Sequence, residues 1–278
     1  MKDFVKSLRN GKMDRFLFFE SVKFAFAREP KSYGEYLRRS VEYAEEYSMD
    51  AIPFTLRFKK EIIAPDQVIK ELSRINTTLS LGLEYSAPFT RTAREVGPTR
   101  FFLELYENPE IKGRILLNTK KACETARIFD GFADFIILID PMSCNDLISP
   151  SYFREYVYPS YKLISQASSL PSVVHLPGRI RKNLPHITDS GINGLQPIDK
   201  NVLDTIVQES QSKIHVIGNI NRRLLVGGGY DNIRHEFMRC MNAHGFNPFI
   251  VHTDFWIPSK ADPERVRILS DLIKDYNN

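Results

Sequence analysis

Eight short runs of β-branched and aromatic residues recur along this chain of 278 residues, and a stretch with helical apolar spacing follows each run. We expect strands at residues 16–21, 49–56, 78–85, 132–140, 172–176, 191–198, 213–220 and 248–254. Several runs are continuously apolar, as in FIILID, which is typical of strands buried on both faces of a parallel sheet. Eight repeats in this length leave about 35 residues each, enough for one strand, one helix and two loops.

The helical spacing is clearest at residues 32–47 and 263–276, where apolar side chains share one face. No stretch of sixty residues lacks the alternation of strand and helix, so no room remains for a linker or a second domain. The sequence therefore predicts the α/β class and a single (β/α)₈ TIM barrel over residues 1–278.

Composition excludes several classes of protein. The formal net charge is only +4 and no basic tract is present, which argues against nucleic-acid binding. No apolar run is long enough to span a membrane, and the N-terminus lacks the pattern of a secretory signal, so we expect a cytoplasmic protein. The three cysteines, which form no C-x-x-C pair, are expected to be reduced thiols.

Polar residues cluster at the predicted carboxyl ends of the strands. In a parallel barrel these ends meet at one mouth, where the connecting loops form a concave surface. The residues at or just beyond these ends are Glu20, Arg57, Glu84, Tyr85, Asp140, His175, Gln196, Asp199, Asn219, Asn221, His252 and Asp254. Such a mouth suits a polar or anionic ligand, although polar strand ends also serve as helix N-caps.

Common catalytic motifs are missing from the sequence. It contains no phosphate-binding loop of the G-x-x-x-x-G-K-[ST] type, no H-E-x-x-H and no G-x-S-x-G. Cys144 lies just beyond one predicted strand and His175 lies at the end of the next, so a Cys/His nucleophile pair is an open alternative to an inert cysteine.

Short motifs occur along the chain in a characteristic order. They are LRNG at 8–11 with DR at 14–15, APFT at 87–90, DPMS at 140–143 with LISP at 147–150, GINGL at 191–195, GN at 218–219 and PE at 263–264. In this order they resemble the motifs of the uroporphyrinogen decarboxylase superfamily, which also contains the methylcobalamin-dependent thiol methyltransferases. The resemblance covers nearly the whole chain and implies a (β/α)₈ barrel, in agreement with the strand count.

Two departures argue against tetrapyrrole decarboxylation. The decarboxylases carry an N-terminal R-Q-A-G-R string, which is absent here. Their aspartate after the second strand corresponds to Arg57, which places a cation where the decarboxylase uses an anion. The Asp140-Pro141 pair and the GINGL string instead resemble the methyltransferase branch.

The methyltransferase branch binds zinc through H-x-C at the end of the fifth strand and a cysteine after the eighth strand. Zinc keeps a thiol substrate deprotonated. This chain retains His175, but Pro177 and Phe255 replace the two cysteines, so we expect no zinc. A site in which His175 and Asp254, with Glu84 or Asp140, hold a harder metal is an open alternative, as is His252 as a substitute ligand.

The resemblance implies a corrinoid-dependent methyltransferase, an enzyme that moves a methyl group between a cobalamin co-substrate and a small molecule. A corrinoid carrier protein is the partner it implies. We expect His175 to exchange a proton and Asp140 to orient it. We expect contacts to substrate or cofactor from Arg57, Glu84, Tyr85, Phe89, Asn219, Asp254, Phe255 and Trp256. A ligand-binding homologue without catalysis and an altered decarboxylase or lyase are the alternatives. The methyl donor, the acceptor and the oligomeric state stay open.

Overall fold

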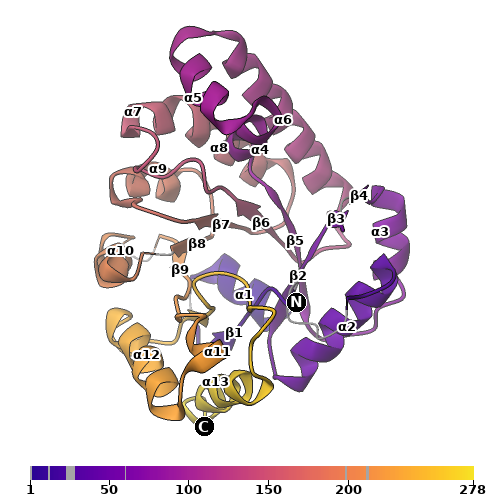
Figure 1. Ribbon diagram of the computed structural model, residues 1–278, viewed down its shortest axis with the longest axis vertical. Helices are drawn as coiled ribbons and strands as arrows, with labels where there is room; N and C mark the ends of the chain where they lie inside the picture. Colours follow the sequence, from indigo (N-terminus) through magenta and orange to yellow (C-terminus); the bar gives the residue numbers. More distant parts are fainter. Residues whose placement is uncertain (1, 12, 23–28, 60, 198, 211–212) are drawn as a thin grey trace.

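Eight parallel strands form a closed barrel surrounded by helices (Figure 1) in the computed structural model, which describes residues 2–11, 13–22, 29–59, 61–197, 199–210 and 213–278. The strands of the barrel are β1 (Leu17–Phe18), β2 (Ala51–Thr55), β5 (Ser80–Ser86), β6 (Phe135–Ile139), β7 (Ser172–Leu176), β8 (Gly194–Pro197), β9 (His215–Val216) and β10 (Ile250–Val251). Six of them pair in the order β2-β5-β6-β7-β8-β9, and β1 pairs with β10. Single bridges from Phe19 to Ala51 and from Ile220 to Thr253 close the ring. The predicted barrel is confirmed.

The helices follow the strands as the alternation predicts. They are α1 (Asp3–Asn10), α2 (Tyr33–Glu46), α3 (Pro65–Leu72), α4 (Pro88–Val96), α5 (Pro98–Glu107), α6 (Glu110–Ile128), α7 (Pro150–Tyr152), α8 (Tyr158–Ala167), α9 (Leu184–Asp189), α10 (Leu203–Ser210), α11 (Leu224–Gly227), α12 (Tyr230–Ala243) and α13 (Pro263–Asp275). Local capping sets the starts of the two helices with the clearest spacing. The Ser32 side chain accepts from the Glu35 amide before α2, and the Asp262 side chain accepts from the Glu264 amide before α13. No helix in the described ranges has the length and apolar character needed to cross a membrane.

One pair of strands was not predicted from the sequence. Strands β3 (Arg57–Phe58) and β4 (Glu61–Ile62) pair antiparallel and stand apart from the barrel sheet. The strands β9 and β10 are also shorter than the runs at 213–220 and 248–254, because beyond them the pairing continues only as separate contacts, such as the hydrogen bond from Ile220 to His252.

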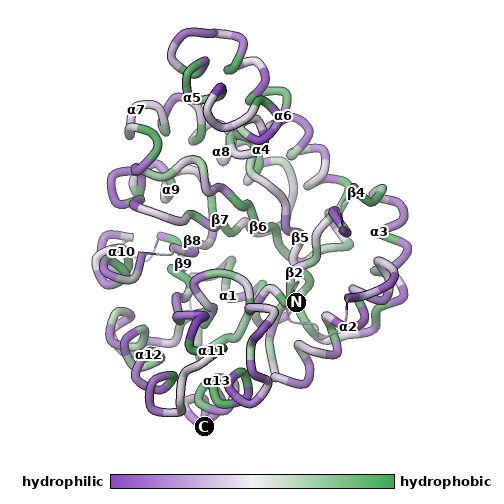
Figure 2. Tube along the Cα trace, viewed as in Figure 1, coloured by the Kyte–Doolittle hydropathy of each residue, from purple (hydrophilic) through white to green (hydrophobic). Residues whose placement is uncertain are grey.

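Alternating side chains divide the core into two layers. Phe135, Ile137 and Ile139 point into the barrel, whereas Ile136 and Leu138 pack against the helices. Hydrophobic residues accordingly follow the strands, with hydrophilic residues on the outer helices and loops (Figure 2). This alternation decides which residues at the strand ends face the mouth.

The N-terminal helix α1 closes the end of the barrel opposite the mouth. The ring of Phe4 lies 4.8 Å from that of Phe135 and 5.6 Å from that of Phe19. Phe135 fits because Gly82 faces it, and a Cβ at that position would lie 2.4 Å from the Phe135 ring. The barrel interior is thus filled by side chains below the mouth.

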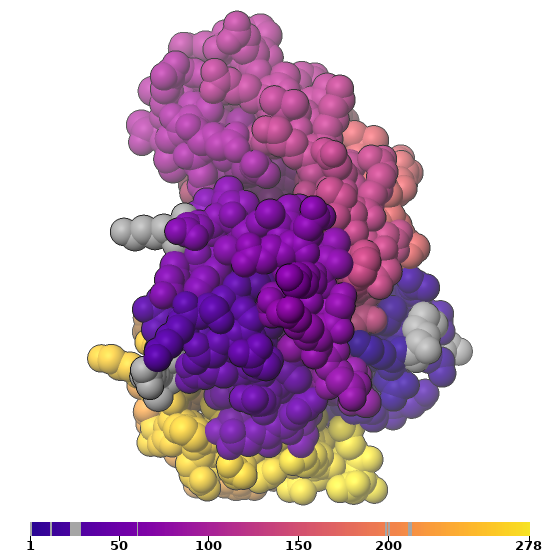
Figure 3. All heavy atoms as spheres, turned by 90° about the vertical axis from the view of Figure 1, so that its right-hand side faces the viewer, coloured from indigo at the N-terminus to yellow at the C-terminus, as the bar shows by residue number. Residues whose placement is uncertain are grey.

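The C-terminal segment contacts the start of the first strand where the ring closes. The Phe16 amide donates to the Asn277 side-chain oxygen at 2.7 Å, and Asn277 Nδ2 donates back to the Phe16 carbonyl at 3.0 Å. Figure 3 shows the C-terminal segment, in yellow, against the indigo and violet first part of the chain. These contacts hold the short β1 strand in place.

Candidate active site

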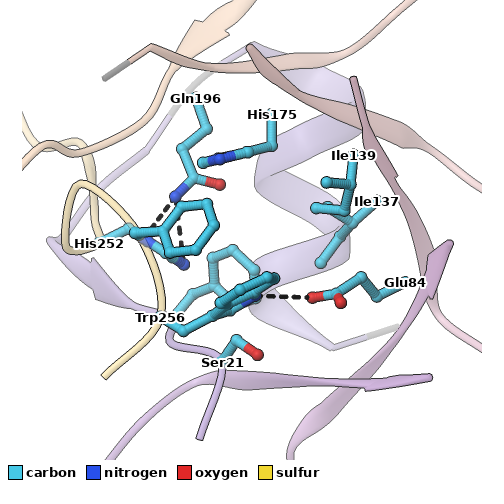
Figure 4. Close-up of a pocket in the computed structure, with 10 residues that line it drawn as sticks. Ser21, Glu84, Ile137, Ile139, His175, Gln196, His252 and Trp256 are labelled. Atoms are coloured by element: carbon cyan, nitrogen blue, oxygen red, sulfur yellow. Dashed lines mark hydrogen bonds between the residues drawn. The ribbon is translucent and has the colours of Figure 1, made fainter. Parts of the chain in front are cut away.

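A small pocket lies at the carboxyl ends of the barrel strands (Figure 4). We call it the inner pocket, and its free volume is about 10 Å³. Its described lining residues are Phe19, Ser21, Glu84, Ile137, Ile139, His175, Gln196, His252, Phe255 and Trp256. Glu84, His175 and Gln196 come from β5, β7 and β8, and the register pairs His175 directly with Gln196. The predicted location of the site at the barrel mouth therefore matches the pocket.

Phe255 and Trp256, which we call the aromatic pair, cover this pocket from the loop after β10. Their ring centroids are 3.9 Å apart, and the Phe255 ring lies 5.2 Å from the His175 ring. The Trp256 indole Nε1 donates to Glu84 Oε2 at 3.3 Å, which ties the loop to β5 across the mouth. The aromatic pair therefore separates the inner pocket from the outside.

A wider depression, the outer groove, lies on the other side of the aromatic pair. Its free volume is about 440 Å³, and it is lined by Arg222, Arg223, Val226, Phe255, Trp256, Ile257, Pro258 and Ser259. The Arg222 guanidinium carbon lies 4.9 Å from the centroid of the Phe255 ring. Its Nε is 3.9 Å from Asp254 Oδ1. Cationic groups are thus present in the outer groove.

His175 is buried and neutral at physiological pH. Burial lowers its pKa to about 4, and the hydrogen bond to Gln196 opposes this shift. Gln196 Nε2 lies 3.3 Å from both His252 Nε2 and the Thr253 carbonyl oxygen. Because the amide nitrogen donates there, the Gln196 carbonyl is left to accept from His175 Nδ1.

The other ring nitrogen of His175 is chemically available. Nε2 is buried and has no hydrogen-bond partner among the residues that the structure describes. With the proton on Nδ1, Nε2 carries a lone pair at the inner pocket. This arrangement can accept a hydrogen bond or a proton from a bound molecule.

His252 and Glu20 lie together beside this pair. Burial lowers the pKa of His252 to about 3, while its hydrogen bond to the Thr253 carbonyl opposes the shift. Its Nε2 is 3.6 Å from Glu20 Oε2. Burial raises the pKa of Glu20 well above its usual value, although Thr253 Oγ1 donates to the carboxyl group at 3.0 Å. Burial therefore disfavours the charged form of both groups.

Four of the sequence-predicted site residues meet at the inner pocket, namely Glu84, His175, Phe255 and Trp256. Asp140 does not. It follows Ile139, which points into the barrel, so its carboxylate points outward, where it accepts from Thr90 and from the Tyr161 hydroxyl at 2.7 Å. Burial raises its pKa. The prediction that Asp140 orients His175 is wrong, and Gln196 holds the ring instead.

Three further residues also lie away from the inner pocket. Tyr85, the neighbour of Glu84, points outward and its hydroxyl donates to the Ala122 carbonyl at 3.4 Å. Phe89 is fully buried on α4, with its ring 4.9 Å from that of Phe101. Asn219 donates to the Pro197 carbonyl at 3.1 Å and accepts from Arg239 at 2.9 Å. These positions correct the expectation of ligand contacts for the inner pocket.

Arg57 and Asp254 lie near the mouth but are not among the lining residues of the inner pocket. Arg57 is exposed on the β3 strand. Asp254 is partly buried and faces Arg222, whose backbone amide donates to Asp254 Oδ1 at 3.4 Å. Both residues therefore lie outside the inner pocket, in the segments around the barrel mouth.

Gln196 and His252 line the pocket, but from the sequence Gln196 was considered only as a strand end and His252 only as a strand end or a substitute metal ligand. The two-residue alternation of side chains along a strand could have identified them as pocket residues. Gln196 lies two residues after Gly194, and His252 two residues after Ile250, a residue of the barrel interior. Counting in steps of two along each strand would have selected them and rejected Asp140.

The residues do not fit the zinc site of the methyltransferase branch. Pro177 and Phe255 offer no ligand atoms in their side chains, and the described ranges of the chain contain no group of three His, Cys, Asp or Glu side chains placed to hold a metal ion. The alternative of a harder metal held by His175, Asp254 and Glu84 or Asp140 gains no support from this geometry. The absence of zinc from the protein stays a prediction.

The fold and this mouth define a barrel protein with a small pocket at the carboxyl ends of its strands, and sequence comparison assigns its family. The family model described as uroporphyrinogen decarboxylase (URO-D) matches residues 64–276. The chain belongs to the uroporphyrinogen decarboxylase family.

Within that family the similar proteins are methyltransferases. A methylated-thiol–coenzyme M methyltransferase from Methanosarcina mazei is 36% identical over 61 residues, which is 22% of this chain and 17% of that protein. A methylcobamide:CoM methyltransferase from Methanosarcina barkeri is 27% identical over 107 residues, which is 37% of this chain and 31% of that protein. The matched segments thus span less than a third of either curated relative.

A solved structure supports the fold over the full length. A methyltransferase from Methanosarcina mazei superposes with a TM-score of 0.84 and covers 99% of this chain and 98% of its own, at 14% sequence identity. At this identity the likeness establishes the shared barrel.

Proposed function

We propose that this protein is a methyltransferase that exchanges a methyl group between a methylcobamide and a small molecule held in the inner pocket. One observation carries the proposal. His175 presents to the pocket an Nε2 with no hydrogen-bond partner among the described residues, at the position that the resemblance gives to the family's zinc-binding histidine. The methyltransferase names of the similar proteins support this activity.

The two compartments at the mouth suit two partners of different size. A cobamide is a broad macrocycle and cannot enter the inner pocket, whose free volume is about 10 Å³. The outer groove, at about 440 Å³, offers apolar surface at Val226, Ile257 and Pro258 and cationic groups at Arg222 and Arg223. These residues would hold an edge of the cobamide, whose cobalt supplies or accepts the methyl group.

The residues of the chain orient and protect the small molecule. Gln196 fixes the tautomer of His175, so that Nε2 is the acceptor for a polar hydrogen of the ligand. The aromatic pair excludes water from the inner pocket and stands between it and the outer groove. Methyl exchange across the mouth therefore requires the aromatic pair to move.

The test is incubation of the purified protein with methylcobalamin and a panel of acceptors, including thiols and tetrahydrofolate. We expect demethylation of the cobalt, visible as a change in the absorbance spectrum, and its loss in His175→Ala. His235→Ala is the matched control, because His235 is exposed on α12.

Two outcomes would redirect the proposal. An unchanged spectrum with every acceptor, together with no binding of corrinoid, would overturn it. The alternative of a ligand-binding homologue is favoured by the replacement of both zinc-binding cysteines, and it would then stand first. Turnover that persists in His175→Ala would keep the activity but remove the role of that residue.

A further inference from the structure

Gln196 lies between the two histidines of the inner pocket (Figure 4). Its side chain comes from β8 and hydrogen-bonds to His175 of β7, while His252 follows β10. The Gln196 amide has a donor end and an acceptor end, so each histidine meets only one of them. The end that faces His252 therefore decides which atom is left to hydrogen-bond with His175.

The surroundings of His252 select the donor end. Gln196 Nε2 lies 3.3 Å from the Thr253 carbonyl oxygen, which can only accept. It also lies 3.3 Å from His252 Nε2, which carries a lone pair because Nδ1 donates to the same carbonyl. If the hydrogen of His252 were on Nε2 instead, Nδ1 at 2.5 Å from the amide nitrogen would be the acceptor. The donor end of the amide is therefore selected in either tautomer of His252.

Burial keeps His252 in the neutral form that this arrangement requires. The residue is only 3% exposed, and burial lowers its pKa to about 3. The Phe19 ring packs against it at a centroid distance of 4.7 Å. A charged imidazolium would carry a hydrogen on both nitrogens and would repel the N–H groups of the Gln196 amide. His252 thus stays an acceptor for Gln196 at physiological pH.

Glu20 holds the second acceptor, the Thr253 carbonyl, in place. The Thr253 backbone amide donates to Glu20 Oε1, and Thr253 Oγ1 donates to Glu20 Oε2 at 3.0 Å. Both residues are buried. These contacts tie the segment after β1 to the segment after β10, and they fix the two acceptors that face the Gln196 amide.

We propose that His252 is a positioning residue of this site: it orients the Gln196 amide and through it places the hydrogen of His175 on Nδ1, so that Nε2 faces the inner pocket as an acceptor. That Nε2 is buried and has no hydrogen-bond partner among the described residues, which leaves its lone pair for a bound molecule. The position of the hydrogen is a property of the protein without ligand, whereas its effect on turnover rests on the proposed function.

The direct test is the tautomer of His175, read by NMR in protein labelled with ¹⁵N at its histidines. A protonated and an unprotonated ring nitrogen differ widely in ¹⁵N chemical shift, so the spectrum shows which nitrogen carries the hydrogen. In the wild type we expect it on Nδ1 of His175, with Nε2 unprotonated. A wild-type spectrum with the hydrogen on Nε2 would overturn the proposal.

Two substitutions of His252 separate positioning from packing. His252→Phe keeps a ring but removes both nitrogens, so we expect the ratio of the Nδ1–H to the Nε2–H form of His175 to fall about tenfold, as for the loss of one hydrogen bond. His252→Gln has a carbonyl that can accept from Gln196 and an amide that can donate to the Thr253 carbonyl. It should therefore retain the wild-type tautomer of His175.

The matched control is His244→Phe, which replaces a histidine stacked on Phe249 at 4.2 Å and outside the lining of the inner pocket. It should leave the tautomer of His175 unchanged. Circular dichroism establishes that each variant is folded, and His252→Leu replaces His252→Phe if the latter does not fold. An unchanged tautomer in the folded variant without the imidazole would overturn the role of His252. Loss of the Nδ1–H form in His252→Gln as well would assign the effect to packing and would also overturn it.

Turnover gives outcomes that are separable from those of the proposed function. His252→Phe should slow demethylation of methylcobalamin by about 10- to 100-fold, the usual loss when the hydrogen-bond partners that orient a site histidine are removed, and His252→Gln should retain most of the rate. The expected tautomer with no reaction of methylcobalamin would overturn only the methyltransferase proposal. Demethylation by a protein in which His175 carries its hydrogen on Nε2 would overturn only the role of His252.

Discussion

Burial controls the protonation of the histidines in this barrel. It lowers the pKa of His175 and His244 to about 4 and that of His252 to about 3. A ring that stays neutral at pH 5 can accept a hydrogen bond over the whole physiological range. The carboxyl groups respond in the opposite direction, since burial raises the pKa of Glu20 and of Asp140.

Protonation of these histidines predicts an acid-labile fold. In the unfolded chain His175 takes up a proton near its ordinary pKa of 6.5, whereas in the folded chain it does so only near pH 4. The contribution of neutral His175 to the free energy of unfolding is therefore full above pH 6.5 and is lost as the pH falls toward 4. Glu20 and Asp140 oppose this trend, because a raised carboxyl pKa gives stability that is lost as the pH rises. We expect His175→Phe to reduce the loss of unfolding free energy between pH 7 and pH 5 by about 2 kcal/mol. Urea unfolding at the two pH values measures it, and an unchanged loss would show that His175 is protonated in the folded protein.

Asp140 is predicted to stabilise the fold without acting on His175. Asp140→Ala leaves the buried hydroxyls of Thr90 and Tyr161 without their acceptor, so we expect the unfolding free energy to fall by roughly 2–4 kcal/mol. Urea unfolding gives this value, and an NMR titration of His175 should give the same pKa as in the wild type. A shifted pKa would restore the orienting role that the geometry removes from Asp140.

At the scale of elements, the loop after β10 determines access to the inner pocket. It carries the aromatic pair, and its hydrogen bond from Trp256 to Glu84 joins it to β5. The same two rings face the outer groove, so one loop controls both compartments. Movement of this loop is the conformational step that the proposed methyl exchange would need.

Loss of the bond to Glu84 should release this loop. In Glu84→Leu the indole has no acceptor at that position, and we expect the Trp256 emission to shift to longer wavelength and its quenching by acrylamide to increase. Glu155→Leu, a change on the surface at a similar residue, should leave both unchanged. Equal quenching in Glu84→Leu and the wild type would mean that other contacts hold the loop closed.

The whole molecule depends on closure of the barrel between its first and last units. Strand β1 is two residues long, and the bonds between Phe16 and Asn277 reinforce its position. Ser270 of α13 adds a hydrogen bond to the Tyr47 carbonyl at 2.7 Å. The C-terminal segment therefore stabilises the positions of strand β1 and helix α2.

Removal of the contact between Phe16 and Asn277 should weaken the closure of the barrel. Asn277→Ala is expected to lower the unfolding free energy by about 1–2 kcal/mol, because two bonds to the Phe16 backbone are lost. The Phe16 amide should exchange its hydrogen faster. The amides of the central strand β6 should exchange faster only by the factor that the loss of global unfolding free energy predicts. An unchanged Phe16 exchange rate would show that β1 is held by its strand neighbours alone.

Strand and helix periodicity and the motif order are local properties of the chain, so the barrel, its family and the place of His175 at a strand end could be predicted without a structure. The replacement of thiolates by Pro177 and Phe255 was visible in the same way. The structure was needed to show that Glu84 faces the pocket whereas Tyr85 and Asp140 face the helices, and that Gln196 is the hydrogen-bond partner of His175. A one-residue shift in a strand reverses the direction of every side chain, and contacts across the mouth, such as that of Trp256 with Glu84, join residues far apart in the chain, so local patterns do not reveal them.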